Sequence, residues 1–131
     1  NPVACAAALA AIDAVEKQNL PARSEALGKR FRDRAEGWMK RFPIIGDIRG
    51  LGGMMAVELV TNRETKAPAD AAQRKLLQYC YEHGVIAIGC GTLGNVVRVL
   101  APLTISDADF DEALDVMEAG LAALCQRQAM R

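Results

Sequence analysis

The sequence predicts an α/β (α+β) domain over residues 1–131, in which helices cover a mainly antiparallel sheet. Stretches with apolar residues three and four positions apart alternate with short stretches rich in β-branched residues. Glycine-rich turns join the β-like stretches, which is typical of hairpins. The chain is 51% hydrophobic and 24% charged, a composition typical of folded domains rather than of disordered chains.

Charge and composition exclude several classes of protein. Sixteen basic and sixteen acidic residues leave no net charge, which argues against a nucleic-acid partner. The longest purely apolar stretch, residues 3–12, is too short to cross a membrane. The cysteines show no CxxC spacing, so we expect free thiols, no zinc site and a reducing, cytoplasmic location. They are Cys5, Cys80, Cys90 and Cys125. Because the chain starts without methionine, we expect it to be part of a longer protein.

Two helices are expected first. Asn1 followed by Pro2 is a helix start, and the alanine-rich pattern continues to about Lys17. Its larger apolar residues form a narrow stripe, and the alanines permit close packing against a neighbour. A second helix is expected from Pro21 until Pro43 stops it, with a basic face opposite its apolar face. The apolar face consists of Leu27, Phe31, Trp38 and Phe42.

A hairpin and a third helix follow. Residues 44–49 and 54–60 read as strands joined by the glycine turn 50–53. After a polar loop, a helix is expected over residues 70–83, closed by Gly84.

Two strands and a long helix complete the expected order. Residues 85–88 form a short apolar stretch, and residues 95–100 form a strong β-branched one. Ser106 and Asp109 resemble a capping box at the start of the last helix. Its wide apolar stripe predicts packing against the sheet. That stripe consists of Phe110, Leu114, Met117, Leu121 and Leu124.

Three features of the sequence that could carry chemistry do not predict catalysis. Residues 89–94 match the dinucleotide pattern G-x-G-x-x-G, but they lead into a strand-like stretch where nucleotide binding needs a helix. His83, beside Gly84, is interpreted as a helix-ending residue rather than a catalytic one. The five lysines lie on charged helix faces or in the polar loop, so none is expected to be a nucleophile. They are Lys17, Lys29, Lys40, Lys66 and Lys75.

Arg98 is the strongest candidate for binding. Strand alternation places it on the same face as Val96 and Leu100, between residues that favour burial. A guanidinium there requires a planar acceptor, and a ligand carboxylate suits it. The alternative is an internal salt bridge, for example to Glu58 on a neighbouring strand, which the pattern alone favours. Arg49 raises the same question with weaker support.

Three blocks of the sequence resemble a known family. Residues 1–10 resemble the Asn-Pro helix start of class III (ω-amino-acid) aminotransferases, and residues 46–59 resemble the small-domain hairpin of that family. Residues 95–105 are similar to its C-terminal signature strand. The blocks occur in order along the whole chain, and residues 90–96 look most like 4-aminobutyrate aminotransferases.

The resemblance implies the C-terminal small domain of a type I pyridoxal-phosphate-dependent transferase. The implied reaction moves the amino group of 4-aminobutyrate or a related ω-amino acid to 2-oxoglutarate, in a homodimer. By position, Arg98 matches the arginine that grips the α-carboxylate of glutamate or 2-oxoglutarate, which reverses the preference for a salt bridge. The catalytic lysine and the pyridoxal 5'-phosphate site would lie in a large domain upstream, so residues 1–131 alone are expected to be inactive.

Two other functions remain open from the sequence. A stand-alone domain could use Arg98 to bind a small dicarboxylate. A dimerisation module is the other, because the basic face of the second expected helix has no evident partner.

Overall fold

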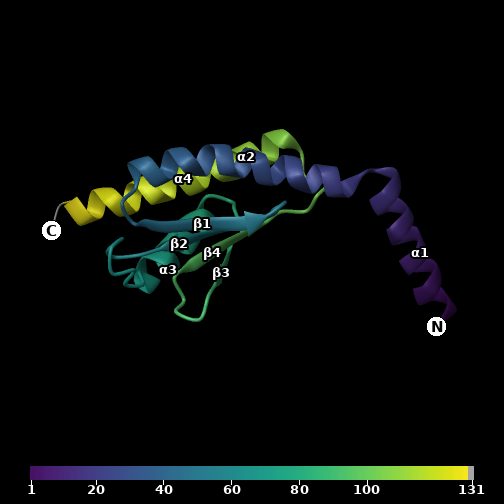
Figure 1. Cartoon of the computed structure of the whole chain (residues 1–131), viewed down its shortest axis with the longest axis horizontal. Helices are drawn as coiled ribbons and strands as arrows, with labels where there is room; N and C mark the ends of the chain where they lie inside the picture. The colour runs from purple at the N-terminus through teal and green to yellow at the C-terminus, as the bar shows by residue number, and fades with distance from the viewer. Residues whose placement is uncertain (130–131) are drawn as a thin grey trace.

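A computed structural model describes residues 1–129 as four helices and one four-stranded antiparallel sheet (Figure 1). The strand order in the sheet is β1-β2-β4-β3. In chain order the elements are α1 (Pro2–Lys17), α2 (Leu20–Arg41), β1 (Ile45–Leu51), β2 (Met54–Leu59), α3 (Asp70–Glu82), β3 (Ile88–Cys90), β4 (Val96–Leu100) and α4 (Asp107–Ala129). The antiparallel sheet and its helical cover confirm the predicted fold class.

The core lies between one face of the sheet and helices α2, α3 and α4. Met55, Val57 and Leu59 alternate along β2 and are buried, and β4 adds Val97 opposite Val57. The apolar stripes of the two long helices meet this face, with Phe31 and Trp38 from α2 almost fully buried. The stripe predicted for the last helix is therefore confirmed as core. It contributes Phe110, Leu114, Met117 and Leu121 to the buried cluster.

Helices α2 and α4 lie side by side and carry opposite charges (Figure 1). Arg30 donates to both carboxylate oxygens of Asp111, each at 2.6 Å. The indole Nε1–H of Trp38 donates to Glu118 at 2.7 Å. The basic face of α2 therefore has a partner within the chain, which removes the observation that favoured a dimerisation module.

Helix α1 extends away from the rest of the chain (Figure 1). The side chain of Asn1 accepts a hydrogen bond from the backbone N–H of Val3 at 3.0 Å, which confirms the predicted cap. None of the residues in α1 is buried. Leu9 is 67% exposed and Ile12 is 55% exposed, so the predicted apolar stripe faces solvent here.

The strand predicted over residues 85–88 is wrong in position. The structure places β3 at Ile88–Cys90, so Gly89 and Cys90, which follow the predicted strand, belong to the sheet. The backbone N–H of Val85 donates to the carbonyl of Cys80, which ties this segment to the end of α3. Gly89 pairs with Val97 under α3, where a Cβ would lie 2.2 Å from Nε2 of Gln73. Glycine therefore permits the close approach of strand and helix.

Candidate functional site

The sheet face opposite the core carries two ordered rows of side chains. One row, the Arg98 row, runs across all four strands through Arg49, Ala56, Arg98 and Ile88. The next row, the Glu58 row, consists of Asp47, Glu58, Val96 and Cys90. These residues share a face because they lie an even number of positions from one another along each strand.

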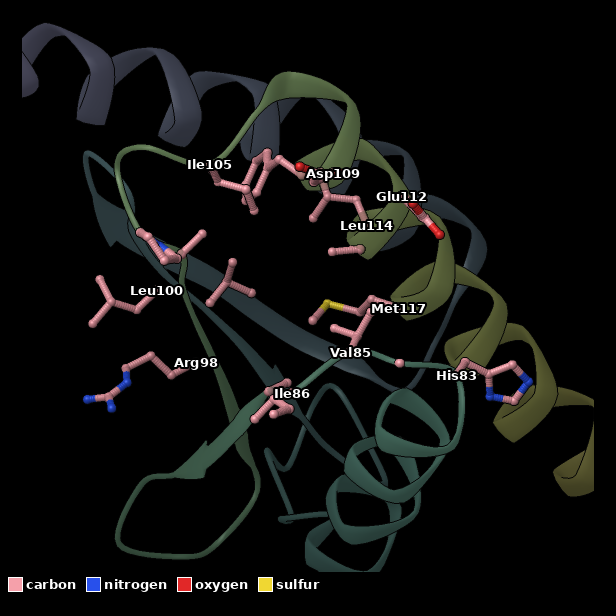
Figure 2. Close-up of a pocket in the computed structure, with 17 residues that line it drawn as sticks. His83, Val85, Ile86, Arg98, Leu100, Ile105, Asp109, Glu112, Leu114 and Met117 are labelled. Carbon is pink, nitrogen blue, oxygen red and sulfur yellow. The ribbon is translucent and has the colours of Figure 1, made fainter.

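Arg98 holds an unsatisfied polar group on this face. Its side chain is half-buried, and its Nε atom is buried without a hydrogen-bond partner among the described residues. Figure 2 shows the guanidinium pointing away from α4 and Met117, toward the face opposite the core. Ala56, directly across on β2, has no polar side-chain atom that could accept a hydrogen bond from Arg98. A buried guanidinium N–H without an acceptor costs free energy, so this site favours an anionic ligand.

Two buried amides fix the strand that presents Arg98. Nδ2 of Asn95 donates to the carbonyl of Leu59 at 2.8 Å, and this carbonyl lies at the end of β2. Nε2 of Gln73 on α3 donates to the carbonyl of Val96 at 3.0 Å. Both amides are buried, and their bonds anchor the start of β4 to a strand and a helix. Sequence reasoning missed both residues, because neither belongs to a pattern that signals burial.

Glu58 forms its salt bridge with Arg49 and not with Arg98, the partner that the sequence had suggested. Its Oε2 accepts a hydrogen bond from Nη1 of Arg49 at 2.6 Å. The same nitrogen donates to Asp47 at 2.7 Å. The hydrogen bonds to Asp47 and Glu58 raise the pKa of Arg49 above its ordinary value, against the opposing effect of burial. Among the described residues, no carboxylate forms a salt bridge with Arg98.

A cleft of about 450 Å³ opens beside the C-terminal half of β4 (Figure 2). Its walls come from the segment 83–87, from the end of β4 and from α4, and most of the lining side chains are apolar. The imidazole of His83 lines one side, but its Nδ1–H donates to the carbonyl of Tyr79 at 2.8 Å and its ring stacks on that tyrosine. His83 is the C-cap residue of α3, as the sequence predicted.

The lysines of this chain are engaged in surface contacts or are exposed. Lys17 and Lys29 form ion pairs with acids four residues away in their own helices. Nζ of Lys66 donates to the carbonyl of Gly46 at 2.7 Å, while Lys40 and Lys75 are exposed. None of these sites is desolvated and open to a cofactor, so the residues of this chain do not fit the attachment of pyridoxal phosphate through a lysine.

The remaining sequence motifs are structural. The G-x-G-x-x-G stretch starts in β3, turns at residues 91–94 and enters β4, so the predicted absence of a helix after it is confirmed. All four cysteines are free, and burial raises the pKa of the Cys80 thiol. Within residues 1–129 no cluster of three metal-ligating side chains occurs. No helix in the same range is sufficiently long and apolar to cross a membrane.

Comparison with known proteins identifies relatives along almost the whole chain. A sequence model of the family described as aminotransferase class-III matches residues 1–121. A probable 4-aminobutyrate aminotransferase of Bacillus subtilis is 42% identical over 94% of this chain. A 5-aminovalerate aminotransferase of Pseudomonas putida is 46% identical over 90% of it. The chain spans 28% of the length of each of these two relatives.

Solved structures of aminotransferases share the fold. An aminotransferase of Bacillus anthracis superposes with a TM-score of 0.87 at 29% identity, over 94% of this chain and 28% of that one. The PMP-bound form of an aminotransferase from Vibrio fluvialis gives a TM-score of 0.83 at 32% identity, over 95% and 27%. The family model covers far more than half of the sequence, and the sheet, the helices and the relatives agree with it. The chain therefore belongs to the class III aminotransferase family.

Proposed function

We propose that this chain is the C-terminal small domain of a pyridoxal-phosphate-dependent aminotransferase that moves the amino group of an ω-amino acid to 2-oxoglutarate. The amino donor is 4-aminobutyrate or a closely related compound, as the names of the two relatives above suggest. The contribution of this chain is Arg98, which binds the α-carboxylate of glutamate or 2-oxoglutarate.

The observation that carries the proposal is the unsatisfied guanidinium of Arg98. Its Nε has no acceptor among the described residues, and the nearest strand carboxylate, Glu58, binds Arg49 instead. A substrate carboxylate offers two oxygens in the plane that a guanidinium matches through parallel hydrogen bonds. Bonds from Gln73 and Asn95 fix β4, so Arg98 is presented on a rigid strand. Rigid placement lowers the entropy lost when the substrate binds.

The rest of the active site is assigned to parts of the protein outside this chain. Its five lysines are exposed or engaged in contacts, so the cofactor and the catalytic lysine belong to a large domain, and residues 1–131 alone should be inactive. We expect the full-length protein to act as a homodimer. A cytoplasmic location accords with four free cysteines, because thiols stay reduced in that compartment.

Substitution of Arg98 in the full-length protein tests the proposal. Arg98→Ala should weaken the use of glutamate and 2-oxoglutarate by about 2–4 kcal/mol, the range for a lost charge-assisted pair in a desolvated site. Arg98→Lys should recover part of this loss, because lysine keeps the charge but not the bidentate geometry. Arg74→Ala is a matched control, since this exposed arginine pairs with Asp70 in its own helix.

Steady-state kinetics with each substrate and thermal melts separate catalysis from folding. Both Arg98 variants should melt near the wild-type temperature, because the guanidinium has no salt bridge in this chain to lose. Normal kinetics in the folded fraction of Arg98→Ala, together with a large loss of stability, would contradict the proposal.

A further inference from the structure

Glu58 lies between two arginines on the sheet face that carries Arg98. It sits opposite Asp47 on β1 and opposite Val96 on β4. Arg49 and Arg98 both pair with Ala56, which is two residues before Glu58 on β2. Glu58 is therefore a diagonal neighbour of each arginine. Such neighbours have Cα atoms about 7–8 Å apart, a separation that two long side chains can bridge.

The structure shows which arginine binds the carboxylate. Glu58 accepts from Arg49 at 2.6 Å, and Arg49 also donates to Asp47 at 2.7 Å. The side chain of Glu58 is only 23% exposed, so its carboxylate needs a protein partner more than a fully solvated one does. Arg98 keeps a buried Nε without an acceptor. In this structure Arg98 is therefore without a carboxylate partner while Glu58 binds Arg49 on β1.

Arg49 is suited to hold Glu58 because it neutralises two acids together. Asp47 and Glu58 face each other across β1 and β2, where like charges repel. A guanidinium between them stabilises both carboxylates. Arg98 on β4 is two strands away from Asp47 on β1 and cannot reach it. The pairing of Glu58 with Arg49 is therefore favoured over its pairing with Arg98 as long as Arg49 is present.

We propose that Arg49 is a positioning residue, which holds Glu58 away from Arg98 and so keeps Arg98 available for the carboxylate of the substrate. This inference rests on the proposed role of Arg98. Without Arg49, the Glu58 carboxylate and the Arg98 guanidinium are unlike charges on a half-buried face, and they pair with each other. The substrate then has to displace Glu58, which lowers its apparent affinity by the fraction of Arg98 that remains free.

Binding of glutarate to the full-length holoenzyme, measured by calorimetry, tests the inference without turnover. Glutarate is a dicarboxylate that lacks both the amino and the oxo group. Arg49→Gln should weaken its binding about tenfold, or about 1.4 kcal/mol, if Glu58 occupies Arg98 about nine-tenths of the time. The KM for 2-oxoglutarate should rise by a similar factor while kcat at saturation changes little. Arg49→Lys keeps one ion pair to Glu58 and should lie near wild type.

The decisive variant is the double substitution. Adding Glu58→Gln to Arg49→Gln removes the competing carboxylate, so glutarate affinity should return to within about twofold of wild type. Glu58→Gln alone leaves Arg98 free and should bind glutarate normally. Arg74→Gln serves as a control for a lost arginine charge on the surface.

The outcomes separate this inference from the proposed function. If Arg98→Ala leaves glutarate binding unchanged, the role of Arg98 itself is wrong. If Arg98→Ala weakens binding but Arg49→Gln does not, the role of Arg98 stands and the role of Arg49 is refuted. The role of Arg49 is also refuted if adding Glu58→Gln to Arg49→Gln does not restore glutarate affinity. It is refuted as well if Glu58→Gln alone binds glutarate more weakly than the wild type.

Discussion

Replacing Gly28 by alanine tests how closely α2 must approach the β1–β2 hairpin. Gly28 is buried in the helix, and a Cβ at this position would lie 1.9 Å from the carbonyl oxygen of Gly52. An ordinary separation of about 3.5 Å therefore requires the turn to move by about 1.5 Å. The hydroxyl of Ser24, one helical turn earlier, accepts a hydrogen bond from the backbone N–H of Gly53 at 2.8 Å and would be pulled apart by that movement.

The expected loss of stability combines three contributions. Overpacking a tight contact costs about 1–3 kcal/mol. The lost hydrogen bond adds about 1 kcal/mol, and the better helix propensity of alanine returns about 0.5–1 kcal/mol. Gly28→Ala should therefore lower the free energy of unfolding by about 1–3.5 kcal/mol.

Gly37 supplies a matched control in the same helix. It is exposed, and a Cβ there would meet nothing within 4 Å. Gly37→Ala should therefore raise the free energy of unfolding by about 0.5–1 kcal/mol. Urea denaturation of both variants of the 131-residue chain measures the change in the free energy of unfolding. It is read from the shift of the midpoint urea concentration when the slope with urea is unchanged. If the two variants were equally stable, the hairpin would not rest on Gly28 as the structure indicates.

Two further predictions concern titration and thiol reactivity. The hydrogen bond from Trp38, followed by the one from Arg41, holds the pKa of Glu118 below its ordinary value of 4.5. A lowered carboxyl pKa contributes stability that is present above about pH 4.5 and is lost as the pH falls through the folded-state value. In Trp38→Phe the free energy of unfolding should therefore fall less than in the wild type as the pH is lowered from 5. Urea denaturation at a series of pH values measures this, and a pH dependence equal to that of the wild type would contradict it. A thiol reagent at pH 8 should label the exposed Cys5 first and Cys80 last, because Cys80 is buried and its pKa is raised. Peptide mapping over time measures the order, and equal rates would refute it.

Local signals in the sequence predicted the helices well. The caps at Asn1 and Ser106 involve contacts two or three residues apart, and both side chains accept the expected backbone N–H bonds. Asp109 binds the Ser106 hydroxyl instead of the backbone N–H that a complete capping box uses. The apolar stripe of the last helix was also predicted correctly, because the spacing of its apolar residues is a local pattern that does not depend on what the helix packs against.

The position of β3 could not be read in the same way. Residues 85–88 carry the apolar, β-branched character of a strand, whereas Gly89 and Cys90 look like a loop. Which residues pair with β4 depends on the end of α3, which ties Val85 to Cys80, and on Gln73, which leaves room for glycine alone at position 89. These contacts join residues that are far apart in sequence or belong to different elements, so no local pattern encodes them.

The sequence pattern named Glu58 as a possible salt-bridge partner of Arg98 but could not show which arginine Glu58 binds. That choice depends on two registers at once, β1 against β2 and β2 against β4. The sequence offered Arg98 and Arg49 as candidates on separate strands, without the geometry that makes both of them diagonal neighbours of one carboxylate. Only the assembled sheet shows that the pair forms with Arg49.

The free state of Arg98 follows from how the fold distributes a balanced set of charges. Asp111 and Glu118 of α4 face α2, where Asp111 binds Arg30 and Glu118 binds Trp38 and Arg41. This pairing occurs over the core side of the sheet, so these carboxylates lie away from the opposite face. There the two acids of the Glu58 row are held by Arg49. Because both strand carboxylates on this face bind Arg49, Arg98 keeps a donor without an acceptor among the described residues, and a substrate carboxylate can satisfy it.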